Sequence, residues 1–442
     1  MTPATRHTQF KPSGAPWLGD IPSHWDVKPL WAMYRPKKDT GHPQETLLSV
    51  YRDYGVIEKS SRDDNKNRES DDLGGYQLVA SGDLVTNKMK TWQGSIAVSS
   101  IQGIVSPAYY VYQKLHTCND AYFHHLFRSV PYITGYQSIS KGIRVGQWDL
   151  EADKFRLFPI LIPPRSEQDA IVAHFDSATV RIAALVAKKT RFIELLREKR
   201  QAVITHAVTK GLHAGVPMKD SGVEWLGEVP AHWTWARLRR FTRSRCDGPF
   251  GSGLKSDNYT DDGARVIRLQ NIGSGVFKAD NTAYIGIDYW QDVLGGGHEV
   301  LSGDLLMAGL GDDNNALGRA CVAPDEIEPA LVKADCYRFR LVSDVDVQYV
   351  ALTLSATAPH ECGLLANGAT RDRLNLGVAS SRVVPMPPLA EQKEIVAHVD
   401  RSTSRIDTLI TKTERSIELL REHRTALITA AVTGKIDLRN AA

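Results

Sequence analysis

The residue types best suited to chemistry in this chain are basic and amide side chains gathered in glycine-containing stretches. These stretches read NKMKTWQG (87–94), SKGIRVGQW (140–148), CDGPFGSGLKSDNY (246–259), ARVIRLQNIGSGVF (264–277), GLGDDNNALGR (309–319) and ATRDRL (369–374). Arginine and lysine donate to guanine edges or to phosphate, and asparagine and glutamine match adenine. Taken singly, each stretch is also what an ordinary solvated loop looks like. Their concentration in two parts of the chain favours a surface that binds nucleic acid.

The candidate DNA-binding residues combine hydrogen-bond donors or aromatic rings with flexible backbone. They are Lys88, Lys90, Trp92, Arg144 and Gln147 in the first part of the chain, and Phe250, Lys255, Asn258, Tyr259, Arg268, Gln270, Asn271, Asn314, Arg319, Arg371 and Arg373 in the second. Because the two sets differ, they predict two surfaces that read different sequences.

Motifs for catalysis, cofactor binding or metal binding are not found. No G-x-x-x-x-G-K-[ST] loop occurs, since Gly434-Lys435 lacks the upstream glycine. SPAYY (106–110) faintly matches the target-amine loop of amino-methyltransferases, but Ser106 replaces the amide or acid that would accept from the amine. The 14 histidines form no H-x-x-x-H pattern, and the five cysteines form no C-x-x-C pair. The sequence therefore predicts no catalytic residue, no metal site and reduced, packing cysteines.

The elements that must position these loops are written twice. WLGDIPSHW (17–25, the first marker) returns as WLGEVPAHW (225–233, the second marker). Residues 163–209 return as residues 387–433, with 28 of 47 aligned positions identical and no gap. The segments between marker and helical block do not repeat recognisably. The order of marker, variable segment and repeated block, given twice, predicts two matched halves.

The repeated blocks have the pattern of long helices. Each opens with a proline pair and Glu-Gln and closes near a glycine, Gly211 or Gly434. Apolar residues follow heptad spacing, interrupted by Lys189 and Lys199, at Ile171, Phe175, Ala178, Ile182, Leu185, Phe192, Leu196 and Val203. The same places in the second block hold Ile395, Val399, Ser402, Ile406, Leu409, Ser416, Leu420 and Leu427. A continuous helix of this length spans roughly 65 Å. We expect the two helices to pair antiparallel, although each stripe would also suit packing on its own globular part.

The variable segments read as mixed helix and short strand. SGDLVTNKM (81–89) and SGDLLMAGL (302–310) predict a turn leading into an apolar strand, and IQGIVSPAYYVY (101–112) predicts two strands around a Ser-Pro turn. The tryptophans of the two markers are expected in the core rather than on a base-stacking surface. The expected fold is α+β, with two globular parts separated by two long antiparallel helices.

Composition indicates an ordinary soluble chain. Charged residues make up 24% and the net charge is +3, which neither proves nor opposes a nucleic-acid partner. The first residues, MTPATRHTQF, have no apolar core for a signal peptide, and no apolar run approaches the 18 or so residues of a membrane span. A cytoplasmic location is therefore expected.

The order of these motifs resembles one family, the specificity subunits of type I restriction–modification systems. The resemblance covers nearly the whole chain and rests on the two markers, the Pro-Pro-x-x-Glu-Gln starts at 163–168 and 387–392, IELLRE at 193–198 and 417–422, SPAYYV and GPFGSGLK. It implies target-recognition domains at 1–160 and 213–384, and helices at 161–212 and 385–442 that set the gap between two half-sites. It also implies a non-catalytic subunit that binds double-stranded DNA, two modification subunits and possibly two nuclease subunits.

The resemblance places S-adenosylmethionine, ATP and Mg on the partners, with no cofactor on this chain. A charged face repeated on both helices is most simply solvated, but it also suits a docking surface for these partners. Its candidate residues are Glu194, Arg197, Arg200, Glu418, Arg421 and Arg424. Two other classes of function fit the sequence less well. A coiled-coil adaptor without DNA is disfavoured by the basic and amide loops, and a self-sufficient methyltransferase or nuclease by the missing cofactor and metal motifs.

Overall fold

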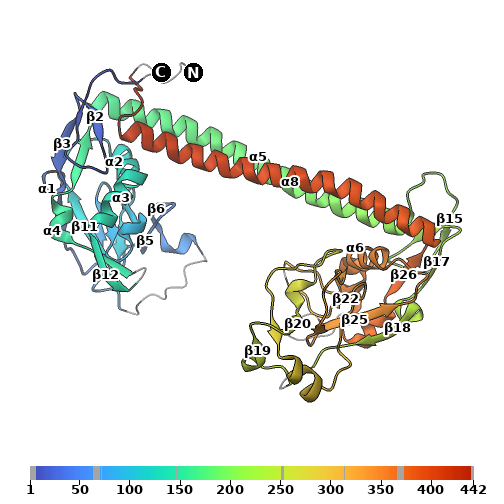
Figure 1. The fold of residues 1–442 in the computed structure, drawn as a ribbon. Coiled ribbons are helices and arrows are strands. Elements are labelled where there is room, and N and C mark those ends of the chain that lie inside the picture. The colour runs from blue at the N-terminus through green and yellow to red at the C-terminus, as the bar shows by residue number, and fades with distance from the viewer. Residues whose placement is uncertain are drawn as a thin grey trace. The chain divides into compact units, whose positions relative to one another are not determined.

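The computed structural model describes residues 6–62, 70, 72–144, 147–249, 253–312, 314–365 and 373–439. The chain divides into two compact units. Unit 1 is Met1–Thr190 with Glu414–Ala442, and unit 2 is Arg191–Thr413. The division cuts the two long helices, α5 (Arg165–Lys210) and α8 (Leu389–Val432), near their middles (Figure 1). Each unit therefore contains one globular part and one half of each long helix.

The globular part of unit 1 is built on a four-stranded antiparallel sheet. Its order is β4 (Tyr34–Lys37), β11 (Tyr109–Lys114), β8 (Leu84–Asn87) and β9 (Ile96–Val98). Two-stranded pairs surround it: β1 (Phe10–Pro12) with β2 (Asp20–Pro22), β3 (Asp26–Pro29) with β14 (Pro159–Ile162), β5 (Leu48–Tyr51) with β6 (Gly55–Glu58), β7 (Gln77–Val79) with β10 (Gly103–Val105), and β12 (Ser140–Arg144) with β13 (Gln147–Leu150).

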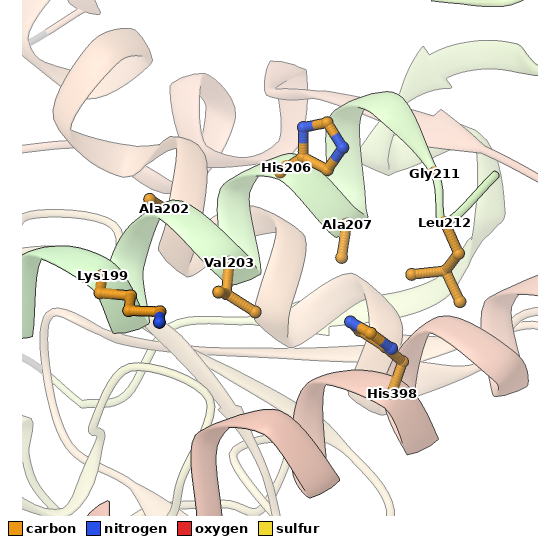
Figure 2. Close-up of a pocket in the computed structure, with 8 residues that line it drawn as sticks. All are labelled: Lys199, Ala202, Val203, His206, Ala207, Gly211, Leu212 and His398. Atoms are coloured by element: carbon orange, nitrogen blue, oxygen red, sulfur yellow. The ribbon is translucent and has the colours of Figure 1, made fainter. Parts of the chain in front are cut away.

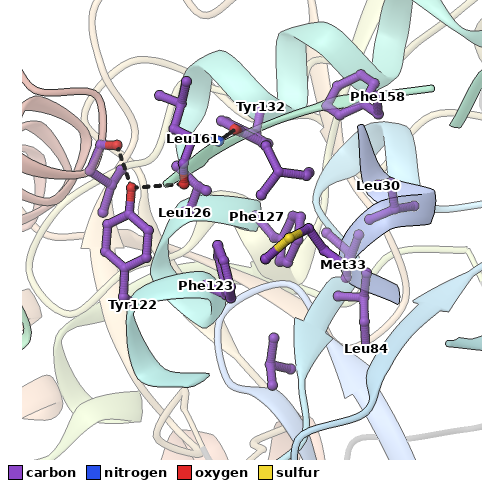
Figure 3. Close-up of a cluster of buried hydrophobic side chains, with 14 of the residues drawn as sticks. Leu30, Met33, Leu84, Tyr122, Phe123, Leu126, Phe127, Tyr132, Phe158 and Leu161 are labelled. Carbon is purple, nitrogen blue, oxygen red and sulfur yellow. Dashed lines mark hydrogen bonds between the residues drawn. The ribbon is translucent and has the colours of Figure 1, made fainter. Parts of the chain in front are cut away.

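Aromatic rings from two short helices fill the core of unit 1. The short helices of unit 1 are α1 (Leu30–Met33), α2 (Asp120–Phe127), α3 (Val130–Ser138) and α4 (Ala152–Arg156), and the rings come from α2 and α3. Figure 3 shows Phe123 and Phe127 of α2 and Tyr132 of α3 among the aliphatic side chains of this core. Each of these rings is fully buried, so the core fixes α2 and α3 against the sheet.

Unit 2 has a four-stranded antiparallel sheet of the same connection pattern. Its order is β18 (Thr242–Cys246), β25 (Cys336–Leu341), β22 (Leu305–Ala308) and β23 (Ala320–Val322). A second sheet has β19 (Tyr259–Thr260), β21 (Tyr284–Ile285), β20 (Ala264–Ile267) and β24 (Ala330–Val332). The pairs are β15 (Met218–Asp220) with β16 (Glu228–Pro230) and β17 (Thr234–Arg237) with β26 (Val383–Met386), and the helices are α6 (Val347–Leu365) and α7 (Leu376–Ser381).

The variable segments thus share a topology that their sequences do not reveal. Sheet β18-β25-β22-β23 repeats β4-β11-β8-β9, β17–β26 repeats β3–β14, and β15–β16 repeats β1–β2. The Ser-Gly-Asp-Leu turns match in detail, because Asp83 accepts from the amide of Ala80 and Asp304 from that of Leu301, both at 2.9 Å. The predicted strands after these turns are confirmed as β8 and β22, and those around Ser-Pro as β10 and β11.

The Glu-Gln pair at each helix start ties the helix to its globular part. Gln168 donates to the Pro163 carbonyl at 2.8 Å and accepts from the amide of Asn119, the N-cap of α2, at 2.8 Å. Gln392 repeats both bonds, to the Pro387 carbonyl at 2.8 Å and from the amide of Asp346 at 2.9 Å. Both glutamines are buried, so each joins helix, strand end and short helix in one polar contact.

The glycine after each long helix packs on a marker: Gly434, after α8, on the first marker, and Gly211, after α5, on the second. A Cβ on Gly434 would lie 2.3 Å from Pro22, and a Cβ on Gly211 would lie 3.3 Å from Trp233. Both glycines also have positive φ, of 70° and 78°, which L side chains rarely adopt. The marker tryptophans Trp25 and Trp233 are fully buried, which confirms them as core residues.

The buried stripe of the long helices differs from the predicted heptads after Ile182. Leu185 and Phe192 are 40% and 45% exposed, whereas Ile193, Leu196 and Ile204 are buried. Helix α8 changes in the same way, with Leu409 exposed and Ile417 buried. The inward-facing positions 178, 182, 186 and 189 are spaced by four, four and three residues, whereas the heptad pattern alternates steps of four and three. This spacing follows the 3.6 residues per turn of a straight helix, so it keeps the buried face pointing in one direction. The prediction of one unchanged heptad was therefore wrong.

Within each unit the two helix halves lie side by side. In unit 2, Ile204 and Val208 of α5 share a core with Ile395 and Val399 of α8, and Arg200 pairs with Asp407 at 2.9 Å (Figure 1). Higher numbers on α5 meet lower numbers on α8, so the halves in this unit run antiparallel.

Helix α5 is also the one described helix long and apolar enough, by length and composition alone, to cross a membrane. One such helix is weak evidence of a span. Its Ile171 and Phe175 are buried in the core of unit 1, and Asp176 and Arg181 interrupt its apolar residues.

Candidate nucleic-acid interface

The first predicted surface lies in the connection from β8 to β9. Lys88 donates to the Pro107 carbonyl at 2.6 Å, and its ammonium lies 4.8 Å from the ring of Tyr110. Lys90 is exposed in the same connection. A half-buried lysine held over an aromatic ring and an exposed one beside it give this turn two positive charges on a fixed backbone.

Two stretches that are far apart in the sequence meet at this turn. Trp92, whose indole donates to the Met89 carbonyl at 3.0 Å, packs on Trp148 of β13 with ring centroids 4.9 Å apart. The amide of Leu150 also donates to the Lys88 carbonyl at 3.1 Å. The structure therefore brings the β12–β13 hairpin against the Lys88–Trp92 turn. Residues 145–146 and the side chains of Arg144 and Gln147 lie outside the described residues.

Three stretches of unit 2 meet around the turn Lys333–Asp335. Lys333 donates to the hydroxyl of Tyr259 at 3.0 Å, and its ammonium lies 5.4 Å from that ring. Arg373 forms a salt bridge with Asp335 at 2.8 Å, and Leu310 forms a β-bridge with Arg373. Lys255, which lies close to Tyr259 in the sequence, is exposed. Its backbone amide donates to the side-chain oxygen of Asn258 at 2.8 Å.

A half-buried aspartate organises this meeting point. Asp247 accepts from the amides of Gly248 and Asp335 at 2.7 and 2.9 Å. Burial raises the pKa of its carboxyl to about 6, against the lowering effect of these two amides. The loop that follows β18 and the Lys333–Asp335 turn are therefore fixed to each other. Because Asp335 pairs with Arg373, this link also holds the exposed guanidinium of Arg373 in place.

Two predicted contact residues are corrected by their burial. Asn271 is 1% exposed, donates to the carbonyls of Lys278 and Asp280, and accepts from the amide of Arg268. Arg319 is 4% exposed and donates to four carbonyls, including those of Leu269 and Ile272. Side chains without access to solvent have no donor left for a base, so both residues support the fold.

Asn271 and Arg319 stabilise the turn η6 (Leu269–Asn271), in which the side chain of Gln270 is exposed to solvent. The expected strand ends at Ile267, so Arg268 and Gln270 lie in this turn rather than on a strand. Arg268 is half-buried and donates to the Asn281 carbonyl at 2.5 Å. Gln270 is thus the amide side chain that the stretch 264–277 leaves accessible.

The remaining candidates of unit 2 are placed less fully. Asn314 is exposed, and its amide donates to Asp312 at 2.9 Å. Phe250 and Arg371 lie outside the described residues. Lys333 was missed by the sequence analysis, because a single lysine in LVKAD has no amide or basic neighbour to mark it.

The predicted docking residues form equivalent sets on the two helices. Arg191 pairs with Glu194 at 2.8 Å, and Arg415 pairs with Glu418 at 2.8 Å in the same i,i+3 geometry. Arg197, Arg421 and Arg424 are exposed. Arg200 is corrected, because it is half-buried and pairs with Asp407 across the helices of unit 2, where it serves the helix pair rather than a free surface.

A shallow apolar cavity of about 320 Å³ lies along the last turns of α5 in unit 2. Figure 2 shows Val203, Ala207 and Leu212 directed toward the same space as His398 of α8. Lys199 stands at its edge. The last turns of α5 and the first turns of α8 therefore combine an apolar hollow with exposed charges.

Comparisons with known proteins identify what this arrangement is similar to. The chain is 24% identical over 379 residues to the type I restriction enzyme MjaVIII specificity subunit of Methanocaldococcus jannaschii, with 83% of each chain covered. It is 22% identical over 319 residues to the EcoKI specificity subunit of Escherichia coli, covering 71% of this chain and 64% of that one. No family model matches the chain.

One solved structure, from work on complex assembly and conformational transition of the type I R-M system, has the same fold. It covers 93% of this chain and 98% of its own, with a TM-score of 0.67 and 15% sequence identity. The resemblance to specificity subunits of type I restriction enzymes is thus confirmed by the sequence comparisons, and the fold agrees with that of a chain from a type I R-M system.

Proposed function

We propose that the chain is the specificity subunit of a type I restriction–modification complex, which reads a two-part site on double-stranded DNA. The observation that carries the proposal is the repeated frame. In both halves the same Glu-Gln pair, marker and glycine join a long helix to a sheet of one topology, while the exposed loops on the sheets differ. A repeated frame suits two copies of one partner, and differing loops suit two different half-sites.

In this proposal the first half-site is read by the turn around Lys88–Trp92 and the hairpin at 144–147. The second is read by Lys255–Tyr259, Gln270 and the surroundings of Arg373. Exposed lysines bind phosphate and set orientation, whereas an accessible amide such as Gln270 has the donor–acceptor pair that matches adenine. The expected boundaries remain 1–160 and 213–384, with the paired helices fixing the gap between half-sites.

The chain's partners in this proposal are two copies of a modification subunit and, in a full complex, restriction subunits. The equivalent charged faces that contain Glu194 and Glu418 are the proposed docking surfaces, because their geometry is the same in the two units. The chain itself supplies no reacting group. S-adenosylmethionine, ATP and Mg belong to the partners, and the location is the cytoplasm.

The decisive experiment exchanges residues 234–383 for the equivalent segment of a relative and maps methylated adenines in cells that carry the modification partner. One half of the methylated site should change, while the other half and the gap stay the same. A change in both halves, or in neither, would contradict the division of labour. The purified chain with S-adenosylmethionine and duplex DNA should transfer no methyl group, and transfer would contradict a non-catalytic role.

Single substitutions test the interface at finer scale. Gln270→Ala should cost about 1–3 kcal/mol of binding to the cognate site and relax discrimination at one base pair of the second half-site. Lys90→Ala should weaken binding to all DNA sequences alike, and the salt dependence of the affinity should fall by the amount expected for about one phosphate contact. Lys412→Ala, on the exposed face of α8, is the matched control and should change neither.

The alternative is an adaptor whose globular parts hold proteins without DNA. It predicts that the assembled complex binds duplexes with no preference for the methylated site. Competition with cognate and scrambled duplexes at several salt concentrations separates the two functions, since sequence preference that survives at raised salt requires base contacts.

A further inference from the structure

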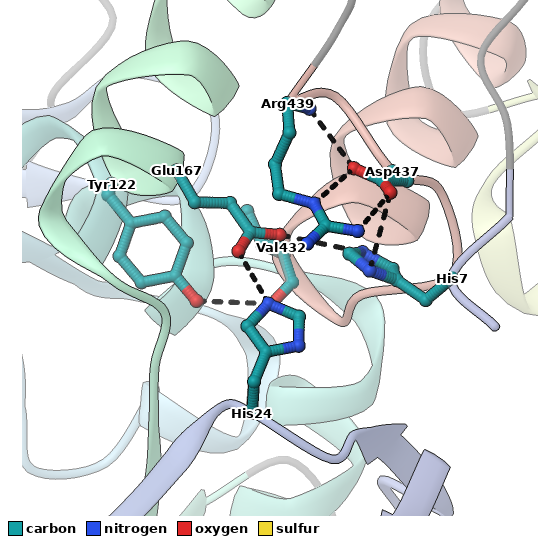
Figure 4. A network of polar contacts seen from close by, with 7 residues as sticks. All are labelled: His7, His24, Tyr122, Glu167, Val432, Asp437 and Arg439. Carbon is teal, nitrogen blue, oxygen red and sulfur yellow. Dashed lines mark hydrogen bonds and ion pairs between the residues drawn. The ribbon is translucent and has the colours of Figure 1, made fainter. Parts of the chain in front are cut away.

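Two histidines and a glutamate from three separate segments meet in unit 1. They are His7 from the segment before β1, His24 from the first marker and Glu167 from the first turn of α5 (Figure 4). His24 Nε2 lies 2.8 Å from Glu167 Oε2, and His7 Nε2 lies 3.5 Å from Glu167 Oε1. One nitrogen or oxygen of each residue lies within 4.8 Å of the other two. The three side chains therefore converge on one point.

The ring of His7 is buried without a hydrogen bond. Its side chain is 5% exposed, and neither ring nitrogen has a hydrogen-bond partner among the described residues. Burying a polar group without a partner costs free energy, and native proteins rarely leave such groups unpaired. A buried imidazole that makes no hydrogen bond and is directed at a carboxylate and a second imidazole points to a missing ligand.

Unit 2 provides the comparison, because it holds the same pair without the third residue. His232 Nε2 lies 2.8 Å from Glu391 Oε2, as His24 does from Glu167. There the other carboxylate oxygen of Glu391 accepts from the indole of Trp233 at 3.1 Å. At the position equivalent to His7, counted from the markers, unit 2 has Gly215.

Unit 1 departs from this arrangement where His7 enters. The indole nitrogen of Trp25, the counterpart of Trp233, is buried with no hydrogen-bond partner among the described residues. The carboxylate oxygen that would accept from it, Glu167 Oε1, instead faces His7. The carboxylate of unit 1 is thus used differently from its counterpart, at the point where a histidine has been added.

We propose that His7, His24 and Glu167 bind a divalent transition-metal ion, with Zn²⁺ the best match. Two imidazole nitrogens and one carboxylate oxygen are a common zinc ligand set, with bonds of about 2.0–2.2 Å. Ligand atoms of a tetrahedral site at these bond lengths lie about 3.3 Å apart. The separations of 2.8 and 3.5 Å run to different oxygens of Glu167, and one candidate ligand atom from each of the three residues lies within 4.8 Å of the other two, so small side-chain rotations would bring the ligand atoms to this spacing around an ion. A water molecule completes the fourth position.

An outer carboxylate orients the added histidine. Asp437 Oδ2 lies 3.8 Å from His7 Nδ1, on the side of the ring opposite Glu167. A carboxylate behind a ligating imidazole fixes the ring and raises its basicity. Arg439 in turn holds Asp437 through contacts of 2.9 and 2.6 Å, so its positive charge is already paired (Figure 4).

The ion would fasten the segment of His7, the first marker and the start of α5 to one another. Unit 2 has a continuous chain from α5 through 211–217 into β15, whereas the matching place in unit 1 is formed by residues 434–439 and 6–9, far apart in sequence. A metal at this place supplies a link that the backbone supplies in unit 2.

The test uses the full chain without an affinity tag, freed of metal with a chelating resin and then titrated with Zn²⁺ or Co²⁺. The wild-type protein should bind one ion tightly, show the visible absorption of tetrahedral Co²⁺ and gain thermal stability with Zn²⁺. His7→Ala should lose at least 100-fold in affinity together with the absorption. Asp437→Asn, which leaves all three ligands, should lose about 10–100-fold.

His232→Ala is the matched control, because it removes the equivalent histidine where no third ligand exists. It should bind one ion as the wild-type protein does. If the wild-type protein binds no ion, or if His7→Ala binds as tightly as wild type, the site does not exist. Loss of binding in His232→Ala equal to that in His7→Ala would also overturn the assignment. Should His7→Ala fail to fold, Asp437→Asn decides by the same readouts.

Discussion

Replacing Gln392 by leucine tests whether the glutamine of each helix start holds the frame together. Leucine keeps most of the volume of the side chain but can neither donate to the Pro387 carbonyl nor accept from the amide of Asp346. Each main-chain group left buried without a partner costs about 1–3 kcal/mol, so the two together cost about 2–6 kcal/mol. Water reaching either group would bring the cost toward the lower figure.

Calorimetry or thermal unfolding followed by circular dichroism measures this effect. For a unit of roughly 150–250 residues, 1 kcal/mol lowers Tm by about 2–4 °C, so even the lower figure predicts a fall of about 4–8 °C. Gln168→Leu removes the equivalent bonds in unit 1 and should cost a similar amount. If the two units unfold in separate transitions, each substitution should lower a different one.

The control is Gln270→Leu, which replaces an exposed glutamine and should change the free energy of unfolding by no more than about 0.5 kcal/mol. A shift at Gln392→Leu no larger than that of this control would refute the reasoning, because it would mean that the two main-chain groups are not held by the glutamine.

Three further predictions concern stability. Gly434→Ala should destabilise unit 1 by more than Gly19→Ala does. Both glycines have φ near 70°, but only at Gly434 would the new methyl group meet another residue, Pro22. Equal Tm values for the two variants would contradict the close approach of Gly434 to Pro22. Leu196→Glu should cost several kcal/mol because the side chain is buried in the helix pair, whereas Leu195→Glu, 46% exposed, should be tolerated; normal folding of both would count against the pairing. Burial lowers the pKa of His124 to about 4, and Arg128 donates to its ring at 2.6 Å. The unfolded chain takes up this proton near pH 6.5, so His124 alone should cost unit 1 up to about 1.4 kcal/mol per pH unit as the pH falls from 6.5 to 4. The pH dependence of the free energy of unfolding, measured with urea, should therefore be less steep in His124→Gln than in the wild-type protein.

The sequence alone was enough to find the two halves and the long helices. Both are local signals: a marker of nine residues, a Pro-Pro-x-x-Glu-Gln start and apolar residues returning every three or four positions. The start and end of α5 at Arg165 and Lys210 lie within two residues of the ends of the repeated block, 163–209. The exposed charges at Glu194 and Glu418 also followed from the repeat, because equal sequences form equal helix surfaces.

The tertiary structure decided what local patterns do not contain. The shared sheet topology of the variable segments was hidden, because a strand requires only apolar alternation and many sequences meet that requirement. Asn271 and Arg319 read as donors for DNA until burial showed them bound to main-chain carbonyls. His7, His24 and Glu167 have no metal-binding spacing, since segments distant in sequence come together only when the core packs. Burial and proximity are properties of the packed chain, and a single sequence records them only where they follow a local period.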